Sequence, residues 1–375
     1  MEKIGIVTLF DYFNIGNKLQ NYALEKIISD LGYEPITVVC SDYLQKKCWK
    51  DHIKILMGRF LKKYRSSLMN EKRYVRFKKE TNFLIVTTEF MTWKEIQQKR
   101  DMGYKALVVG SDQVWFNWQK IDGELEFRFL TFVEKRKRIC FAPSFGRDDI
   151  DEQNIDVYRN WLNGFERLSC REKSGCDLIY RITGRKSELL CDPTMMLNME
   201  QWNQISRKPI YELPTKYVML YFLSEPSKDQ LALIHKYASD NQCQIVDVYN
   251  VNYPQYYYTT PQEFLYCIEH AAYVFTNSFH GTVFSILFHK QFVVFSRNDI
   301  QARMNNRCIT LLQKFQMQNH LNNISNEKIN YGVIDELLKA EREKSLMYLQ
   351  EELKRAIAGD EVCLLYTSPS PRDKR

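Results

Sequence analysis

The first 39 residues, MEKIGIVTLFDYFNIGNKLQNYALEKIISDLGYEPITVV (1–39), decide the fold class. Residues 3–9 are a short apolar run that predicts a buried strand, and residues 16–31 repeat apolar side chains at helical spacing. Gly32 is a typical residue for ending that helix, and residues 35–39 predict a second strand. A strand, a helix and a strand in succession normally form a parallel β-α-β unit.

The same alternation continues along the chain in two series. The first series ends before a polar stretch at 198–216 that contains two prolines, and the second follows it. The expected strands of both series lie at 106–110, 138–142, 167–170, 188–191, 217–223, 243–249, 273–276 and 291–296. This pattern predicts an α/β protein with two Rossmann-like domains, 1–205 and 206–358, that face a shared cleft.

Two further helices have clear sequence signals. Thr260, Pro261 and Glu263 form a helix start, with a capping hydroxyl, a proline at the first position and an acid at the third. A long helical pattern at about 333–358 is expected to close the fold and to end at Gly359. Residues 359–375 change composition abruptly, so we expect them to be a disordered tail that is foreign to the fold.

Composition excludes several classes of protein. The chain is 45% hydrophobic, enough for sizeable cores, and its most apolar window is interrupted by polar residues, so no membrane span is expected. The ten cysteines are dispersed without any CxxC pair, which favours free thiols in a cytoplasmic protein and argues against a metal site. Neither GxGxxG nor GxxxxGK is present, so an ordinary dinucleotide or P-loop site is disfavoured.

The net charge of +7 is concentrated in one segment. Residues 45–80 hold 13 Lys/Arg against 3 Asp/Glu, a surplus of 10, within a lysine-rich stretch at 45–100 that we expect to be helical. A solvated helical face explains this surplus most simply. Contact with an anionic membrane surface or a phosphorylated, lipid-linked acceptor is the functional alternative. No nucleic-acid-binding motif accompanies the charges.

Polar clusters follow the expected strands, where ligands of parallel α/β sheets collect. In "TNSFHGTVFSILF" (276–288), an apolar run carries polar residues at its start, which predicts a strand-to-helix turn whose free N–H groups favour an anion. His280 at this turn adds a titratable group. Structural roles remain open elsewhere, since Asn14, Asn17 and Asp112 could each cap a helix and Gly16 could permit a turn.

Taken together and in order, these clusters resemble the polysaccharide pyruvyl transferase family. The resemblance runs from about residue 4 to 357. The matching stretches are FNIGNKLQNYAL (13–24), GSDQVW (110–115), SFG (144–146), LSCREKSG (168–175), CDPTMMLN (191–198) and TNSFHGTVFSI (276–286). It implies a fold like that of GT-B glycosyltransferases and the transfer of pyruvate from phosphoenolpyruvate to two sugar hydroxyls as a cyclic ketal, with release of phosphate.

The resemblance also implies site residues. The family's SFHG histidine corresponds to His280, at the donor phosphate or as an acid. Its RE arginine corresponds to Arg171 and its downstream arginine to Arg303, and the resemblance implies that both bind the donor. We take Asp112 as the candidate base, because ketal formation needs a group to accept a hydroxyl proton. The remaining expected site residues are Asn277, Ser278 and Gly281 for the donor, Asn14, Gly16 and Asn17 in the N-terminal loop, and Ser111 and Ser144 elsewhere in the cleft.

No cofactor or metal is expected beside the donor substrate. The expected partners are phosphoenolpyruvate and a glycan of a surface or extracellular polysaccharide, or its lipid-linked precursor, met in the cytoplasm or at the inner face of the cell membrane. Two alternatives remain open: a GT-B-type glycosyltransferase that uses a nucleotide sugar, and a non-catalytic sugar-binding protein of polysaccharide assembly, because one fold hosts many functions.

Overall fold

The N-terminal half is built on a five-stranded parallel sheet in the order β3-β2-β1-β4-β5. The computed structural model describes residues 1–44, 49–82, 84–85, 87–99, 103–116, 123–297, 305–325 and 327–367. The strands are β1 (Lys3–Val7), β2 (Glu34–Cys40), β3 (Thr88–Met91), β4 (Ala106–Val109) and β5 (Arg138–Cys140). Helix α1 (Ile15–Asp30) joins β1 to β2, which confirms the predicted β-α-β unit.

The sequence predicted that residues 45–100 are helical, and the structure shows that this is only partly correct. Its helices are α2 (Trp49–Met57), α3 (Arg65–Thr81) and α4 (Trp93–Gln98), but residues 88–91 form the edge strand β3, parallel to β2. The prediction was wrong there because the lysine-rich composition on both sides favoured a helix over this short stretch of β-forming residues. Its strand conformation depends on pairing with β2.

The C-terminal half contains a four-stranded parallel sheet in the order β11-β10-β8-β9. Its strands are β8 (Tyr217–Tyr221), β9 (Gln244–Asp247), β10 (Tyr273–Thr276) and β11 (Phe292–Val294), and its helices are α10 (Lys228–Asp240), α11 (Pro254–Tyr257), α12 (Pro261–Glu269), α13 (Phe279–Leu287) and α14 (Asn305–Lys314). The predicted helix start at Thr260 is confirmed, because Thr260 and Glu263 form a reciprocal capping box at α12.

A smaller parallel pair, β6 (Ser169–Cys170) and β7 (Glu188–Leu189), lies between the two sheets in the sequence. The helices of this region are α6 (Ile155–Asn163), α7 (Lys173–Thr183), α8 (Pro193–Met196) and α9 (Met199–Asn203), whereas α5 (Gly123–Arg128) precedes β5 of the first sheet. The predicted boundary between 205 and 206 falls in the connection from β7 to β8 and stays a prediction.

One of the apolar core clusters contains residues of both halves. Ile6 of β1, Met219 of β8 and Leu353 of the closing helix α15 (Tyr331–Thr367) belong to the same buried cluster. The turns after β1 and β10 also meet, since Gly16 at the first turn of α1 lies against His280 at the first turn of α13. The carboxyl edges of the two sheets therefore face each other, the arrangement expected of two Rossmann-like domains.

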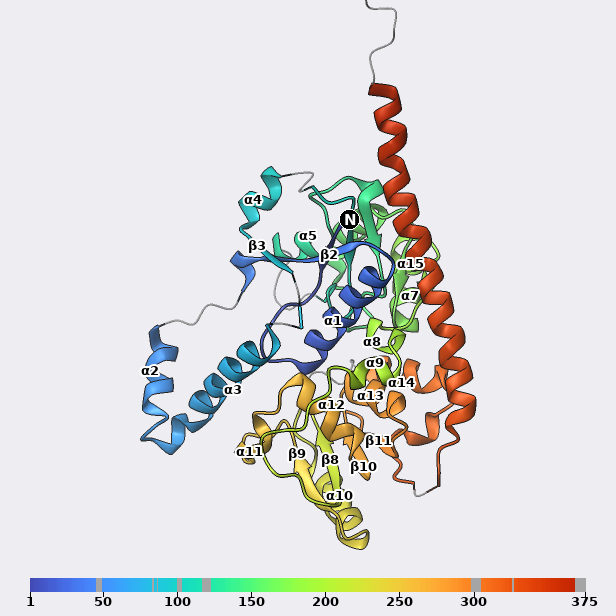
Figure 1. Cartoon of the computed structure of the whole chain (residues 1–375). Coiled ribbons are helices and arrows are strands. Elements are labelled where there is room, and N and C mark those ends of the chain that lie inside the picture. Colours follow the sequence, from blue (N-terminus) through green and yellow to red (C-terminus); the bar gives the residue numbers. More distant parts are fainter. Residues whose placement is uncertain are drawn as a thin grey trace, which may run out of the picture.

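Helix α15 runs beside both halves and continues past its predicted end (Figure 1). The backbone is helical through Gly359 to Thr367, so the predicted helix end at Gly359 is wrong. That residues 359–375 form a disordered tail foreign to the fold stays a prediction. A single glycine inside a helix costs only about 1 kcal/mol relative to alanine, and no proline occurs before residue 369 to stop the helix. Residues 368–375 lie outside the described residues.

Three predicted absences can be compared with the described part of the chain. Eight of the ten cysteines have described side chains, and these are free thiols, six of them buried. Within the same ranges, no group of three or more His, Cys, Asp or Glu side chains could hold a metal ion. No described helix is long and apolar enough to cross a membrane.

Candidate functional site

Four turns bring ionisable side chains together where the two sheets meet. Ser111 and Asp112 follow β4, Arg171 follows β6, Asp192 follows β7, and His280 lies at the start of α13 after β10. All five side chains are at least nine-tenths buried. These five residues, spread over positions 111 to 280 of the sequence, therefore form one cluster.

Arg171 is the centre of this cluster. Its Nη1 donates to Asp192 Oδ2 at 2.7 Å, and its Nη2 donates to Asp112 Oδ1 at 3.0 Å. The guanidinium also lies 4.3 Å from the ring centroid of Phe279, close enough for a cation–π contact. The sequence predicted that Arg171 binds the donor, but both of its terminal nitrogens already bind carboxylates. In this structure Arg171 holds two acidic side chains in place.

Asp192 links Arg171 to the histidine. Its Oδ1 accepts from the backbone N–H and the hydroxyl of Thr194 at the start of α8, and its Oδ2 accepts from Ser111 Oγ at 2.6 Å. The same Oδ2 lies 3.8 Å from His280 Nε2, within ion-pair reach but long for a hydrogen bond. Burial opposes ionisation of Asp192, but the neighbouring His280 and Arg171 together hold the pKa of its carboxyl far below the usual range.

Asp192 was missed as a site residue. The only sequence signal was an acid before Pro193 in CDPTMMLN, which reads as an ordinary helix cap. Asp192 is indeed the cap of α8. One of its oxygens caps the helix and the other faces Arg171 and His280, and a cap signal cannot reveal this second contact.

His280 lies in a closely packed environment. Its side chain is only 7% exposed, and a Cβ added at Gly16 would lie 2.0 Å from its Nδ1. Its Nε2 is buried and has no hydrogen-bond partner among the described residues. Because buried polar atoms are nearly always paired, this orphaned nitrogen favours a site completed by a ligand or water. The predicted strand-to-helix turn at 276–281 is confirmed, with Ser278 as the cap of α13.

The other residues predicted at this turn make structural bonds. Asn277 accepts from the N–H of Leu223 at 2.8 Å and donates to Ser224, so it joins the turns after β8 and β10. Ser278 Oγ accepts from the N–H of Gly281 at 3.4 Å. Gly281 itself has no room for a side chain, because a Cβ there would lie 2.3 Å from Thr276 Oγ1.

The N-terminal loop contributes a second polar group to the interface. Asn14 caps α1 and accepts from the N–H of Gly16 at 2.9 Å, as the structural alternative proposed. Asn17 donates to Asp11 Oδ2 at 2.7 Å, while its own Oδ1 is buried and lacks a partner among the described residues. Burial lowers the pKa of the neighbouring Lys18 to about 8, against the attraction of Asp11 and Glu25.

Lys18 was also missed in the sequence. Its ammonium lies over the rings of Phe10 and Tyr12, at 4.3 and 4.7 Å from their centroids. A lysine within GNKLQ looks like a solvated helix residue, and only the tertiary structure shows that it is 3% exposed. A buried amine beside an anion-favouring helix start is a candidate contact for an anionic substrate.

A second buried arginine borders the cluster from α14. Arg307 binds the side chain of Gln113 when the Gln113 oxygen faces it, at 2.6 Å from Nη1 and 2.7 Å from Nη2. Burial, followed by the charge of Arg171, lowers the pKa of Arg307 to about 10. The predicted Arg303 lies outside the described residues, so Arg307 is the arginine that the structure places near the cluster downstream of α13.

Ser144 is structural. Its Oγ accepts from the N–H of Gly146 at 3.0 Å, and its carbonyl accepts from the N–H of Trp115. Glu172 shares this region and accepts from the N–H of Phe145 at 3.0 Å. Burial raises the pKa of the Glu172 carboxyl, and its Oε2 has no hydrogen-bond partner among the described residues.

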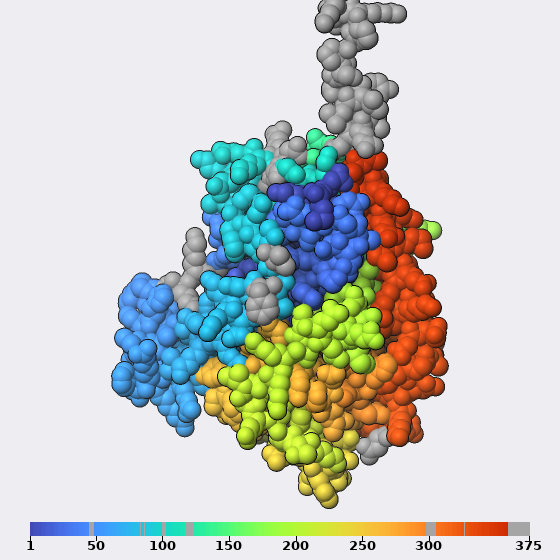
Figure 2. Space-filling view, viewed as in Figure 1, coloured from blue at the N-terminus to red at the C-terminus, as the bar shows by residue number. Residues whose placement is uncertain are grey.

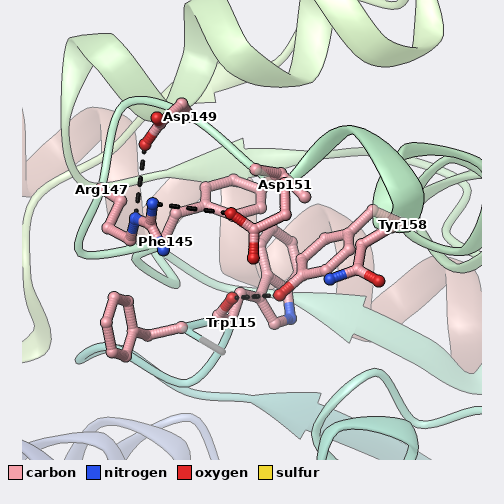
Figure 3. A pocket seen from close by; sticks show the side chains of 9 residues that line it. Trp115, Phe145, Arg147, Asp149, Asp151 and Tyr158 are labelled. Carbon is pink, nitrogen blue, oxygen red and sulfur yellow. Dashed lines mark hydrogen bonds and ion pairs between the residues drawn. The ribbon is translucent and has the colours of Figure 1, made fainter. Parts of the chain in front are cut away.

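A small pocket lies beside the loop of Ser144 but contains none of the predicted site residues (Figure 3). Its cation, Arg147, is within ion-pair distance of Asp149 at 3.3 Å and Asp151 at 3.8 Å. Tyr158 closes the other side by donating to the carbonyl of Trp115 at 3.0 Å. Because these polar groups are already paired with one another, the pocket adds nothing to the chemistry of the cluster.

Fold and cluster together define an α/β protein of two parallel sheets whose acids, arginines and histidine gather between facing carboxyl edges, the usual ligand position in such folds. A model of the family described as polysaccharide pyruvyl transferase matches residues 14–299. The chain belongs to the polysaccharide pyruvyl transferase family. Every predicted site residue except Arg303 lies within the matched range.

Other comparisons are remote. No curated protein matches the chain. Among solved structures, MurG of Acinetobacter baumannii is 8% identical with a TM-score of 0.42 and covers 98% of this chain and 100% of its own. UDP-GlcNAc 2-epimerase of Neisseria meningitidis is 9% identical with a TM-score of 0.46, covering 97% and 100%. TM-scores below 0.5 carry no conclusion about this chain.

Proposed function

We propose that the protein transfers pyruvate from phosphoenolpyruvate to two hydroxyls of one sugar and forms a cyclic ketal. The methylene carbon of the donor gains a proton, both sugar oxygens bond to C2, and the C2–O bond to phosphate breaks. Of the two hydroxyl protons released, one balances the new methyl group and the other leaves with phosphate. Family membership and the buried cluster around His280 support this proposal.

His280 is the proposed acid or phosphate anchor. Its buried Nε2 lacks a partner among the described residues, so it can donate to a ligand that enters the cluster. Asp192 stays anionic beside it and complements a protonated imidazole, as carboxylates do for catalytic histidines. Arg171 then acts as a positioning residue, because its two terminal nitrogens bind Asp192 and Asp112.

The donor carries a phosphate and a carboxylate, so cations must hold it. We propose Lys18 and Arg307 for this task beside the originally expected Arg303. Both are buried: Lys18 lies in the first turn of α1, whose Gly16 meets His280, and Arg307 lies near Arg171 and Asp112. Asp112 remains the proposed base; Arg171 binds its Oδ1, so Oδ2 is the oxygen that we propose accepts the hydroxyl proton. The chemistry proposed here needs no cofactor beside the donor.

We further propose that the acceptor is a sugar of a surface or extracellular polysaccharide or of its lipid-linked precursor. Phosphoenolpyruvate is a cytoplasmic metabolite, so the reaction belongs in the cytoplasm, at the inner face of the membrane when the acceptor is lipid-linked. The family description supports a polysaccharide as the modified molecule.

The most informative experiment is to determine which donor the protein binds. Phosphoenolpyruvate should raise the melting temperature of the protein, whereas UDP and GDP should not. With a suitable glycan, phosphate release should accompany a mass gain on the sugar. A shift with a nucleotide alone would favour a glycosyltransferase, and sugar binding without phosphate release from any donor would favour a non-catalytic protein.

His280→Ala should lower phosphate release by at least about a hundredfold while the protein still folds, since a positioned acid typically contributes 10² or more in rate. His235→Ala is the matched control, because His235 is exposed on α10 and is not a member of the cluster. Near-normal turnover of the His280→Ala variant would remove His280 from the mechanism.

A further inference from the structure

Helices α2 and α3 form an arm that stands out from the body of the protein (Figures 1 and 2). The arm is anchored by α3. Arg73 is buried against the rings of Phe13, Tyr249 and Tyr257 and donates to backbone carbonyls of the C-terminal half. These contacts fix the base of the arm to both halves and leave α2 at its outer end.

Some basic side chains of the segment 45–80 therefore make internal contacts. The membrane contact predicted for this segment can involve only the remaining ones. Arg76, like Arg73, faces inward: it forms an ion pair with Glu263 and donates to the carbonyl of Tyr258 at 2.9 Å. Neither arginine is available to a membrane. Any surface contact has to come from the outer part of the arm, residues 49–64.

That outer part exposes an unusual number of large apolar side chains. Trp49, Ile53 and Leu56 recur at positions i, i+4 and i+7 of α2, so they share one helical face. Their exposed fractions are 67%, 43% and 56%, and just beyond the helix Phe60 is 83% and Leu61 46% exposed. A soluble protein normally buries such a set, and a contiguous exposed group marks an interaction surface.

Almost all charged side chains in the same segment are positive. Residues 49–64 contain five Lys/Arg and a single acid, Asp51, which lies 3.6 Å from Lys54 Nζ. The other cations are Lys50, Arg59, Lys62 and Lys63, all on the exposed surface. A set of exposed apolar side chains that includes Trp and Phe, bordered by lysines, matches the interface of an anionic bilayer in both charge and polarity.

We propose that residues 49–64, the arm surface, dock the protein on anionic lipid bilayers. Helix α2 lies in the plane of the interface, its apolar stripe enters the headgroup boundary, and the cations meet lipid phosphates. A nine-residue helix is far too short to span a membrane, so the attachment is peripheral and reversible. The inference does not depend on the donor or on the reaction.

Sedimentation of the full chain with vesicles tests this proposal. Vesicles of phosphatidylcholine with about 30% phosphatidylglycerol should bind the protein, and vesicles of phosphatidylcholine alone should bind it weakly. Binding should weaken as salt rises, because the charges are screened. Lys50→Gln combined with Lys62→Gln should weaken binding about thirtyfold at low salt, from about 1 kcal/mol per lysine.

The apolar part of the surface has its own variant. Trp49→Ser with Ile53→Ser and Leu56→Ser should lower binding at least about tenfold at every salt concentration. Ile210→Ser is the matched control, since Ile210 is 83% exposed outside the arm surface. Unchanged vesicle binding of the triple variant would overturn the proposal. The proposal would also fail if the wild-type protein did not bind anionic vesicles. It would fail as well if the triple substitution altered self-association, measured by light scattering, but not vesicle binding.

Discussion

Replacing Gly16 by alanine probes the contact between the two halves. The added Cβ would lie 2.0 Å from Nδ1, 2.5 Å from Cγ and 2.7 Å from Cε1 of His280. Even the closest tolerable packing needs a separation near 3 Å, so the ring or helix α1 must move by about 1 Å. Such overpacking costs about 1–3 kcal/mol, whereas the better helix propensity of alanine returns about 1 kcal/mol at most. The free energy of unfolding should therefore fall by up to about 2 kcal/mol.

The loss of activity should be larger than this loss of stability suggests. A displacement of about 1 Å at a reacting group can lower a rate about a hundredfold. Urea unfolding measures the first effect, and phosphate release from phosphoenolpyruvate measures the second. Gly332→Ala is the control, because a Cβ there meets only Asn330 Oδ1 at 3.4 Å. Phosphate release should stay unchanged, and stability should at most rise by the gain in helix propensity, about 1 kcal/mol.

A double-mutant cycle tests the contact between Gly16 and His280 by stability measurements alone, without an activity assay. If the imidazole causes the strain, Gly16→Ala should no longer destabilise the protein once His280 is alanine, and the coupling free energy should be about 1–3 kcal/mol. Equal destabilisation in both backgrounds would show that Gly16 and His280 are not in contact in solution. Wild-type stability and phosphate release in the single variant would refute both the contact and the proposed role of His280.

Two further substitutions test the charges around the interface. Arg171→Lys keeps the positive charge but cannot reach both Asp112 and Asp192, so urea unfolding should show a loss of about 1.5–3 kcal/mol, the value of one charged hydrogen bond; a loss below about 0.5 kcal/mol would contradict the buried pairing. For Lys18, a folded pKa of about 8 below the unfolded 10.5 means that the unfolded chain holds the extra proton, so the penalty is complete below pH 8 and disappears as the pH rises to 10.5. Lys18→Met should thus stabilise the protein by up to about 3 kcal/mol at pH 7, with the advantage shrinking toward pH 10.5; a pH-independent difference between the two proteins would argue against a buried amine.

Where prediction from the sequence failed, the deciding contact came from a distant part of the chain. The charge pattern at 45–80 could not separate Arg73, which the aromatic rings of the C-terminal half enclose, from the exposed lysines beside it. Likewise, a capping signal at Asp192 was correct and incomplete, because its second oxygen binds Arg171 from another turn. Such contacts leave no trace in local periodicity, which reports only the neighbours three or four residues away.

The sequence by itself determined the elements and the turns. Apolar periodicity predicted α1 and most of the strands, and the Thr260 capping box and the turn before His280 were recognisable because caps are satisfied by residues within one helical turn. Only the tertiary structure decided which turns meet. Ser111 and Asp192 are 81 residues apart, and their contact depends on sheet order and on the packing of one half against the other. That packing also decided that position 16 has no space for a side chain beside His280.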